Sequence, residues 1–259
     1  MLTPEEINKS NQEKFQHKYT VENVSIKTAV DHNDYFYKLV KVRITYLKEY
    51  CLGKKVLDIG CGSGDYLFEI KGMIADGCGI DYTDKAIEAA CSKKGLNLVE
   101  NLKFIKADAQ KMPFEDGSFD LVYSFSTLSS IPDLGRIIKE VERVLKPEGL
   151  AILEIGNRLS LNTFVCDAHP ELAKQTHVRI SDMRKMLDLS RMSLVDQRAF
   201  GILPFWADKP AWLKPLLHER WKKIFQIELK GKMLDEWVSN FFLFKPFAYR
   251  HFLFVRKQS

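Results

Sequence analysis

The chain lacks long apolar runs and paired cysteines, and each absence argues against a class of protein. No apolar stretch reaches the roughly 18–20 residues that a membrane-spanning helix needs. The five cysteines form no C-x-x-C pair and no metal-ligand spacing, so we expect free thiols and no metal site. Residues 1–19 are polar and contain acids, unlike a signal peptide. These features favour a cytoplasmic location.

The chain also lacks the usual sequences of phosphate-binding loops. Residues 56–64, VLDIGCGSG, are a short apolar run followed by three glycines at alternate positions. A dinucleotide-binding loop, G-x-G-x-x-G/A, has its third small residue three positions after the second glycine, where this chain has Asp65 directly after Gly64. A carboxylate at this place would repel a pyrophosphate, and no Gly-Lys-Ser/Thr follows as in a P-loop. The loop therefore suits a cationic cofactor without phosphates.

Strand and helix patterns alternate after Gly53. Short apolar runs predict strands at 55–59, 77–81, 102–106, 119–124, 150–155, 193–200 and 249–256. Helices are predicted between them, at 65–71, 83–94, 133–145 and 181–189. This order predicts an α/β, doubly wound, Rossmann-like fold, with ligands bound outside the carboxyl ends of parallel strands.

Segments on both sides of this pattern complete the expected organisation. Residues 1–52 read as an N-terminal helical cap that begins at Thr3-Pro4-Glu5-Glu6, and 53–202 as the core. Residues 203–247 read as a basic, aromatic helical lid insertion, and 248–259 as the final core strand.

Four blocks in order resemble the class I S-adenosylmethionine-dependent methyltransferases of the small-molecule group. They are VLDIGCGSG, GIDYTDKAIEAA, FIKADAQKMPFEDGSFDLVYS and RVLKPEGLAILEI, and they lie between about Gly53 and Glu154. The resemblance implies S-adenosylmethionine as cofactor. It also implies a seven-stranded, mostly parallel sheet whose last strand is antiparallel and lies beside strand six.

The resemblance assigns the glycine loop to the methionine part of the cofactor. Gly60, Gly62 and Gly64 would let the backbone approach the ligand closely, with Cys61 between them. Asp58 would orient this loop or meet the cofactor's amino group through water. The alternative reading of the three glycines is an ordinary tight turn.

Residues at the ends of the following strands would hold the nucleoside. Asp81 would bind the ribose hydroxyls, and Tyr82 would stack on adenine or be a surface tyrosine. Asp108 would accept from the adenine amino group, with the backbone N–H of Ala109 donating. Ser124 would line the methyl-donor end.

Histidine is missing where many of these enzymes have a histidine pair. Residues 128–133 read LSSIPD instead, although a hydroxyl nucleophile usually needs a general base. His177, His169 and Asp167 in the segment after strand five are candidates, as is His32 in the N-terminal cap, with a structural role as the alternative for each. Tyr19 would close over the cofactor.

The carboxyl-terminal part is basic and aromatic. From Gln197 onward there are twelve Lys and Arg against five acids, and all four tryptophans lie there. The 203–247 insertion could be a packed lid, a cap for a lipid-linked acceptor at a membrane surface, or a nucleic-acid surface. Its acids and the lack of a recognisable RNA-binding module argue against nucleic acid.

These features predict methyl transfer to a small molecule, with O-methylation of a sugar or lipid-linked glycan as the first expectation. C-methylation of a quinone-like or other lipid is the alternative. A methyltransferase-like binding protein without catalysis is a second alternative, which the missing histidine pair leaves open. Asp65 and the Asp108 block argue against a nicotinamide-dependent oxidoreductase. No feature indicates an oligomeric state.

Overall fold

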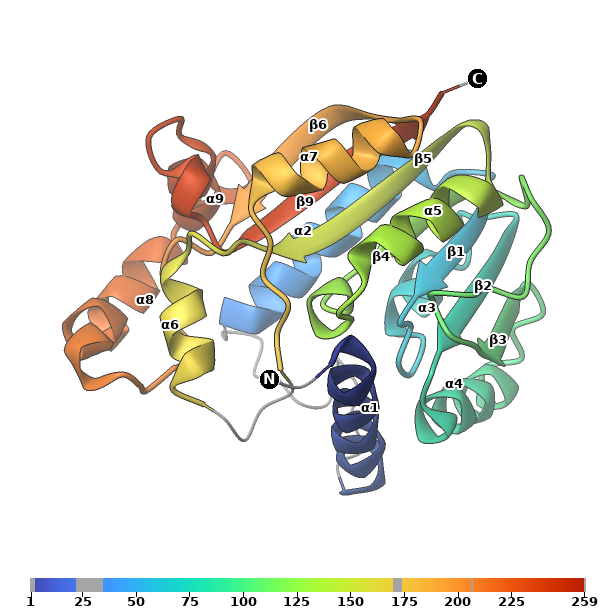
Figure 1. The fold of residues 1–259 in the computed structure, drawn as a ribbon, viewed down its shortest axis with the longest axis horizontal. Helices are drawn as coiled ribbons and strands as arrows, with labels where there is room; N and C mark the ends of the chain where they lie inside the picture. The colour runs from blue at the N-terminus through green and yellow to red at the C-terminus, as the bar shows by residue number, and fades with distance from the viewer. Residues whose placement is uncertain (1–2, 22–34, 170–173, 206, 259) are drawn as a thin grey trace.

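A seven-stranded sheet forms the centre of the molecule, with strand order β3-β2-β1-β4-β5-β9-β6 (Figure 1). The computed structural model describes residues 3–21, 35–169, 174–205 and 207–258, without the side chains of 17–21 and 36. The strands of the sheet are β1 Lys55–Ile59, β2 Asp76–Asp81, β3 Leu102–Lys106, β4 Phe119–Ser124, β5 Leu145–Gly156, β6 Met192–Phe200 and β9 Arg250–Lys257.

The pairing directions confirm the predicted fold class. β1 pairs in parallel with β2 and β4, β2 with β3, and β4 with β5. β9 runs antiparallel to both β5 and β6 and lies between them. The strand order reverses between β1 and β4, and this is where doubly wound sheets open a crevice for ligands.

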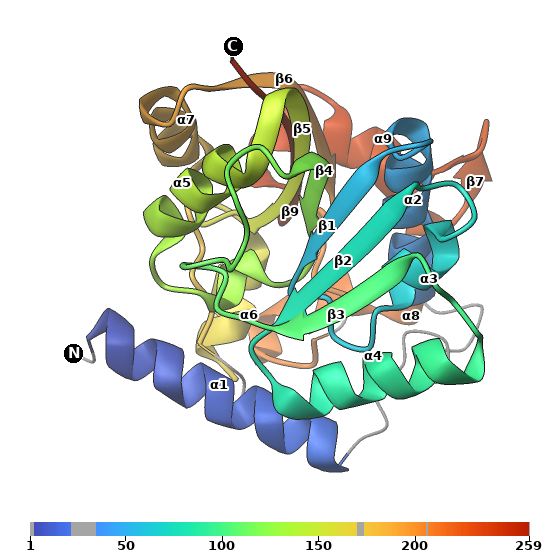
Figure 2. The same ribbon diagram turned by 90° about the vertical axis from the view of Figure 1, so that its right-hand side faces the viewer.

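Helices cover both faces of the sheet (Figure 2). They are α1 Pro4–Val21, α2 Tyr35–Tyr50, α3 Asp65–Ile70, α4 Asp84–Leu96, α5 Leu134–Val144, α6 Leu161–Asp167, α7 Ile180–Leu189, α8 Glu219–Phe225 and α9 Leu234–Asn240. Successive residues of β1 point to opposite faces, so Val56 packs with α2 and α3 while Leu57 packs with α5 and α7. Two apolar layers therefore fix the sheet from both sides.

The N-terminal helix α1 begins where the sequence predicts. The backbone N–H of Glu6 donates to Thr3 Oγ1 (3.2 Å), and the Thr3 N–H donates to Glu6 Oε2 (2.7 Å). This reciprocal capping satisfies two donors at the start of the helix. α1 lies beside the carboxyl ends of the parallel strands (Figure 2).

Some element boundaries differ from the prediction. β5 begins at Leu145 rather than 150, because Leu145 already pairs with Phe119 of β4; the register then shifts before Leu150 pairs with Leu121. α7 begins at Ile180, one residue before the predicted start, so Ser181 lies inside it. The described residues between β6 and β9 form short elements. Besides α8 and α9 these are η2 Ala211–Leu217, β7 Glu228–Leu229, β8 Lys232–Met233 and η3 Lys245–Phe247.

Candidate functional site

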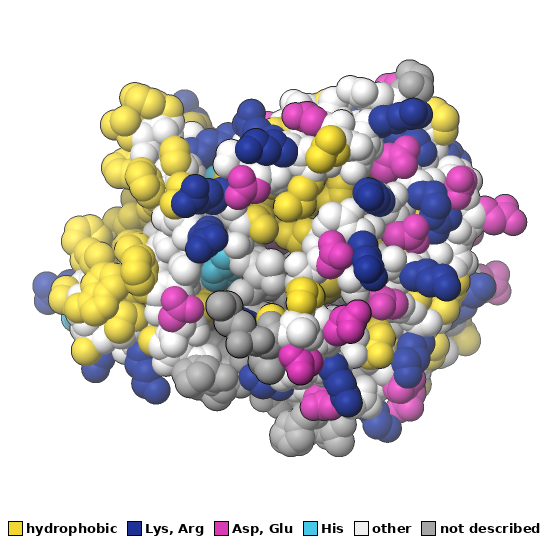
Figure 3. Space-filling view, in the orientation of Figure 1, with side chains coloured by type: hydrophobic (Ala, Val, Ile, Leu, Met, Phe, Trp, Pro, Cys, Tyr) yellow, Lys and Arg dark blue, Asp and Glu magenta, His cyan; other side chains and the backbone are white. Residues whose placement is uncertain are grey.

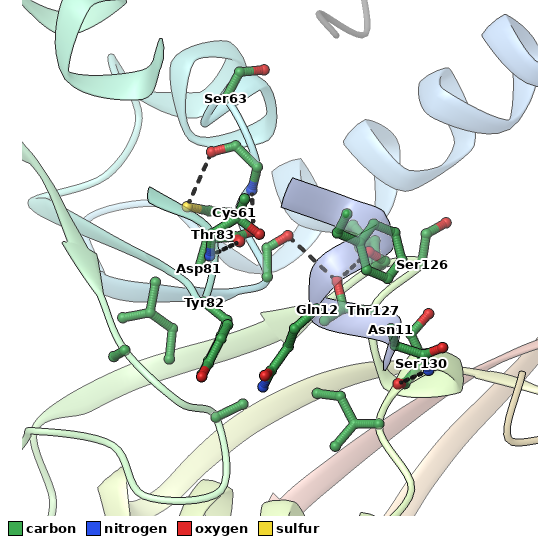
Figure 4. Close-up of a pocket in the computed structure, with 18 of the residues that line it drawn as sticks. Asn11, Gln12, Cys61, Ser63, Asp81, Tyr82, Thr83, Ser126, Thr127 and Ser130 are labelled. Carbon is green, nitrogen blue, oxygen red and sulfur yellow. Dashed lines mark hydrogen bonds between the residues drawn. The ribbon is translucent and has the colours of Figure 1, made fainter. Parts of the chain in front are cut away.

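A cavity of about 360 Å³ opens at the carboxyl ends of β1, β2 and β4 (Figure 4). Ligand sites for small molecules commonly have volumes of about 300–1,000 Å³. Its walls come from the loop after β1, the end of β2, the segment after β3, the segment after β4, and helices α1 and α2. Six regions of the chain thus meet at the predicted ligand edge of the sheet.

The glycine loop forms one wall of this cavity. Gly60, Gly62 and Gly64 have φ of 75°, 54° and 76°, a left-handed conformation that glycine adopts without strain. A Cβ on Gly60 would lie 2.2 Å from Thr127 Oγ1, so the loop can pass the segment after β4 only without a side chain there. Gly60, Cys61 and Gly62 line the cavity, whereas Gly64 precedes α3 and does not line it.

Asp81 lies at the end of β2, next to the glycine loop. Its Oδ2 accepts from the Gly62 N–H (3.0 Å), and its Oδ1 accepts from the Thr83 N–H (2.9 Å). Burial raises the pKa of Asp81 above its usual value, although these hydrogen bonds oppose the shift. Each oxygen keeps a further lone pair for a ligand, so the carboxylate is positioned to accept two hydroxyls.

The segment after β3 supplies the other predicted nucleoside residues. Asp108 and Ala109 line the cavity, and Asp108 Oδ1 accepts from the Gln110 N–H (2.9 Å). Tyr82 also lines the cavity and is 46% exposed, which leaves one ring face open to a ligand. These three residues and Asp81 therefore surround one space, as the resemblance implied.

Asp65 adds a further carboxylate to the cavity wall. It accepts from Ser63 Oγ (2.7 Å) and forms an ion pair with Lys93 of α4. Asp65, Asp81 and Asp108 outnumber the single lining arginine, Arg43. A cavity with this charge disfavours a pyrophosphate and suits a sulfonium cofactor.

Arg43 of α2 belongs to a buried polar cluster behind the cavity. Its guanidinium donates to Tyr66 Oη (2.9 Å), Ser126 Oγ (2.6 Å) and Glu154 Oε1 (2.8 Å). Glu154 is also paired with Arg250, so two arginines share one carboxylate. Burial opposes the charge of Glu154, but the two arginines lower its pKa overall. The cluster carries a surplus positive charge beside Ser126, a lining residue.

The end of the cavity opposite Asp81 and Tyr82 was only partly predicted from the sequence. Asn8, Asn11, Gln12 and Phe15 of α1 line the cavity, opposite Asp81 and Tyr82 (Figure 4). Their spacing of three and four residues puts them on one face of a helix. This spacing is the feature of the sequence that could have identified them as lining residues. Residues after β4 complete this end, namely Phe125, Ser126, Thr127, Ser130 and Ile131.

Two predicted site residues lie below the cavity rather than in its wall. Asp58 is buried and accepts from Tyr123 Oη (2.9 Å), and burial raises its pKa to about 8. Ser124 is fully buried and donates to the backbone oxygen of Ile59 (2.9 Å). Both side chains tie β1 to β4 and thereby support the loops above them.

Neither histidine predicted as a base lines the cavity. His177 packs edge-on against Tyr249, its Nδ1 lies 3.2 Å from Thr163 Oγ1, and burial lowers its pKa to about 4. His169 follows α6, and its Nε2 lies 3.3 Å from Asp208 Oδ1. The structure thus places both away from the predicted cofactor residues, and His177 is a weak base where it lies.

Other sequence predictions also fall away from the cavity. Asp167, at the end of α6, does not line it. His32 and the side chain of Tyr19 lie outside the described residues. No described residue of 203–247 lines the cavity, whereas four residues of α1 do.

Comparison with known proteins agrees with this geometry. The model of the methyltransferase domain family matches residues 52–226. A sterol 4-C-methyltransferase of Caenorhabditis elegans is 39% identical over 98 residues, which are 38% of this chain and 29% of that protein. A demethylmenaquinone methyltransferase of Staphylococcus aureus is 37% identical over 103 residues, 39% of this chain and 42% of that protein. The chain thus spans less than half the length of these relatives.

A solved structure extends the similarity to most of the fold. An S-adenosylmethionine-dependent methyltransferase of Methanosarcina mazei superposes with a TM-score of 0.55 at 21% identity, covering 82% of this chain and 97% of that one. The family match spans more than half of the chain and includes the glycine loop, Asp81 and Asp108. The chain therefore belongs to the methyltransferase domain family, whose class I members use S-adenosylmethionine as cofactor.

Proposed function

We propose that this protein transfers the methyl group of S-adenosylmethionine to a lipid-like small molecule. The observation that carries the proposal is that the glycine loop, Asp81 and Asp108 line one cavity with an excess of carboxylates. The cofactor supplies a methyl group on a positively charged sulfur, which leaves as a neutral thioether when the nucleophile attacks in line. What the chain supplies is position and the exclusion of water.

The lining residues divide this work between two ends of the cavity. Asp81 and Asp108 would hold ribose and adenine, and Gly60 and Gly62 would let the methionine part lie against the backbone. Ser126 and the other residues after β4 would border the reacting carbon and sulfur. Asn11 and its neighbours on α1 would close this end against water.

The class of acceptor is inferred from the site and from the relatives. No histidine is among the described residues that line the cavity, so the histidine bases expected from the sequence do not border it. The two relatives quoted above are named for a sterol and for demethylmenaquinone, which are both lipids. We therefore favour carbon methylation of a quinone-like or other lipid over the sugar O-methylation expected first. A contact of 203–247 with a membrane surface is part of this proposal.

Binding and turnover test the proposal separately. Calorimetric titration with S-adenosylmethionine, its demethylated product and NADH should show micromolar binding of the two sulfur ligands alone. With methyl-labelled S-adenosylmethionine, detergent-dispersed demethylmenaquinone or a sterol should then give labelled product. Glucose and a phenol are tested beside them as alternative classes of acceptor. Binding without turnover on any acceptor would favour the non-catalytic alternative, and binding of NADH instead would refute the proposal.

A further inference from the structure

Exposed apolar side chains are concentrated in one part of the molecule. Of the twenty exposed large hydrophobic residues in the described ranges, twelve lie between 211 and 247. Figure 3 shows patches of hydrophobic side chains, in yellow, in the region of α8 and α9. We call this surface the aromatic face and define it by Phe164, Trp212, Trp221, Trp237 and the loop 241–244. Single exposed apolar residues are ordinary, but a concentration of this kind marks an interaction surface.

Ring contacts join the elements of the aromatic face. Phe164 of α6 meets Trp212 of η2 edge-on, with ring centroids 5.8 Å apart. The loop after α9 carries four consecutive large apolar residues, Phe241, Phe242, Leu243 and Phe244, which are 48%, 71%, 57% and 46% exposed. The phenylalanine rings pack on one another, and the ring centroids of Phe241 and Phe242 are 4.7 Å apart. Four consecutive exposed apolar side chains make this loop suited to contact with an apolar medium.

The polar surroundings of the aromatic face are cationic. Between 203 and 247 six Lys and Arg side chains are exposed, against three exposed acids. The other two acids, Asp235 and Glu236, are buried and do not contribute to the surface charge. Asp235 accepts from Tyr35 Oη (2.8 Å) and the Gly201 N–H (2.7 Å), and Glu236 accepts from the Met233 N–H. A surplus of exposed cations beside aromatic side chains complements anionic lipid headgroups.

We propose that the aromatic face docks the protein on the surface of an anionic lipid bilayer, with the loop 241–244 inserted among the acyl chains. This inference deepens the proposed function, since it rests on a lipid-like acceptor. In the ranges that the structure describes, no helix is long and apolar enough to cross a bilayer, so the contact is peripheral. Aromatic rings prefer the boundary between headgroups and chains, which fits their place here.

The segment after β5 connects the aromatic face to the cavity. It contributes Phe164 to the face and, further on, Lys174, whose backbone N–H donates to Asn11 Oδ1 (2.8 Å). Asn11 Nδ2 in turn donates to the backbone oxygens of Lys174 (3.0 Å) and Ser130 (2.8 Å). Asn11 and Ser130 line the cavity, so one segment borders both the membrane-docking surface and the site.

Vesicle sedimentation tests the docking surface directly. The full chain is mixed with vesicles of phosphatidylcholine, with and without phosphatidylglycerol. The double variant Phe242→Ser/Leu243→Ser should lower binding to anionic vesicles by about tenfold or more, because two exposed apolar side chains no longer enter the bilayer. The matched control Leu96→Ser/Leu98→Ser removes two side chains that are 87% and 88% exposed elsewhere, and should bind as the wild type does.

Equal vesicle binding by both double variants would overturn the proposed docking surface. Failure of the wild type to bind anionic vesicles would overturn it too. A wild-type dimer that Phe242→Ser/Leu243→Ser converts to a monomer would instead assign the face to contact between copies, and would also overturn it. Calorimetry with S-adenosylmethionine separates the two proposals. Cofactor binding without vesicle binding refutes only the docking surface, and vesicle binding without cofactor binding refutes only the proposed function.

Discussion

Replacing Asp81 by Asn is the sharpest test of the cofactor site. The carboxylate accepts one backbone N–H with each oxygen and has one lone pair on each left for a ribose hydroxyl. Asn keeps the shape but loses the charge, and its NH₂ group would face either the Gly62 or the Thr83 N–H. Hydrogen bonds to charged groups contribute about 1.5–3 kcal/mol each, so losing two of them should weaken binding by at least ~3 kcal/mol, roughly 100-fold in Kd.

The same substitution should leave the fold intact. The folded pKa of Asp81 is raised, so its contribution to stability is fully present only below the unfolded pKa and declines as pH rises through the folded pKa. The raised pKa therefore gives no stabilisation of the charged form at neutral pH, but the Asn NH₂ group that faces one of these two N–H donors should lower the free energy of unfolding by ~1–3 kcal/mol. Urea unfolding checks this value, and calorimetry with S-adenosylmethionine checks the affinity.

A neighbouring acid provides the control for Asp81→Asn. Asp84 begins α4, is exposed, and pairs with Lys106 outside the cavity. Asp84→Asn should keep wild-type affinity. If Asp81→Asn binds S-adenosylmethionine as tightly as the wild type, or if both variants weaken it equally, Asp81 does not hold the ribose.

Three further predictions concern buried ionisable side chains. Glu154→Gln should lower the free energy of unfolding by ~3–5 kcal/mol in urea, because Arg43 and Arg250 lose their shared anion; an unchanged midpoint would contradict this. The pKa of Asp58 is raised to about 8, so wild-type stability should fall as pH rises from about 4 to 8, and Asp58→Asn should remove that slope in unfolding at pH 5.5 and 8. The pKa of His177 is lowered to about 4, so wild-type stability should fall as pH drops from about 6.5 to 4. His177→Gln should weaken this fall and leave the pH profile of turnover unchanged, whereas loss of the acidic limb of that profile would restore His177 as the base.

Local sequence signals predicted the strands of the sheet and the edge at which the cavity opens. β1 and β4 are short apolar runs, and the positions of Gly60, Asp81 and Asp108 follow from strand ends that must meet at one edge. The same logic placed Ser124 in the cavity, but the last residue of β4 points into the sheet and donates to Ile59. Successive strand residues face opposite ways, so an error of one position moves a side chain from the wall to the core.

The closure of the cavity could not be predicted in the same way. Asn11 reaches Ser130 and Lys174 across 119 and 163 positions of sequence. Such contacts depend on how a separate helix docks on the finished sheet, and no local periodicity encodes that. For His177 the error was different. Its place in the segment after strand five suggested the pocket, whereas the side chain packs against Tyr249 and does not line the cavity.

Burial also changes how the charge of the 203–247 insertion is interpreted. Counted along the sequence, its acids dilute the lysines and arginines and weaken any argument from charge. In the structure Asp235 and Glu236 are inside, where they accept hydrogen bonds from Tyr35 and from the backbone of Gly201, Ile202 and Met233. The exposed surface is consequently more basic than the composition indicates. A basic surface alone would suit nucleic acid as well as lipid, and it is the four consecutive exposed apolar residues at 241–244 that favour a bilayer, since a phosphate backbone offers no apolar medium for them to enter.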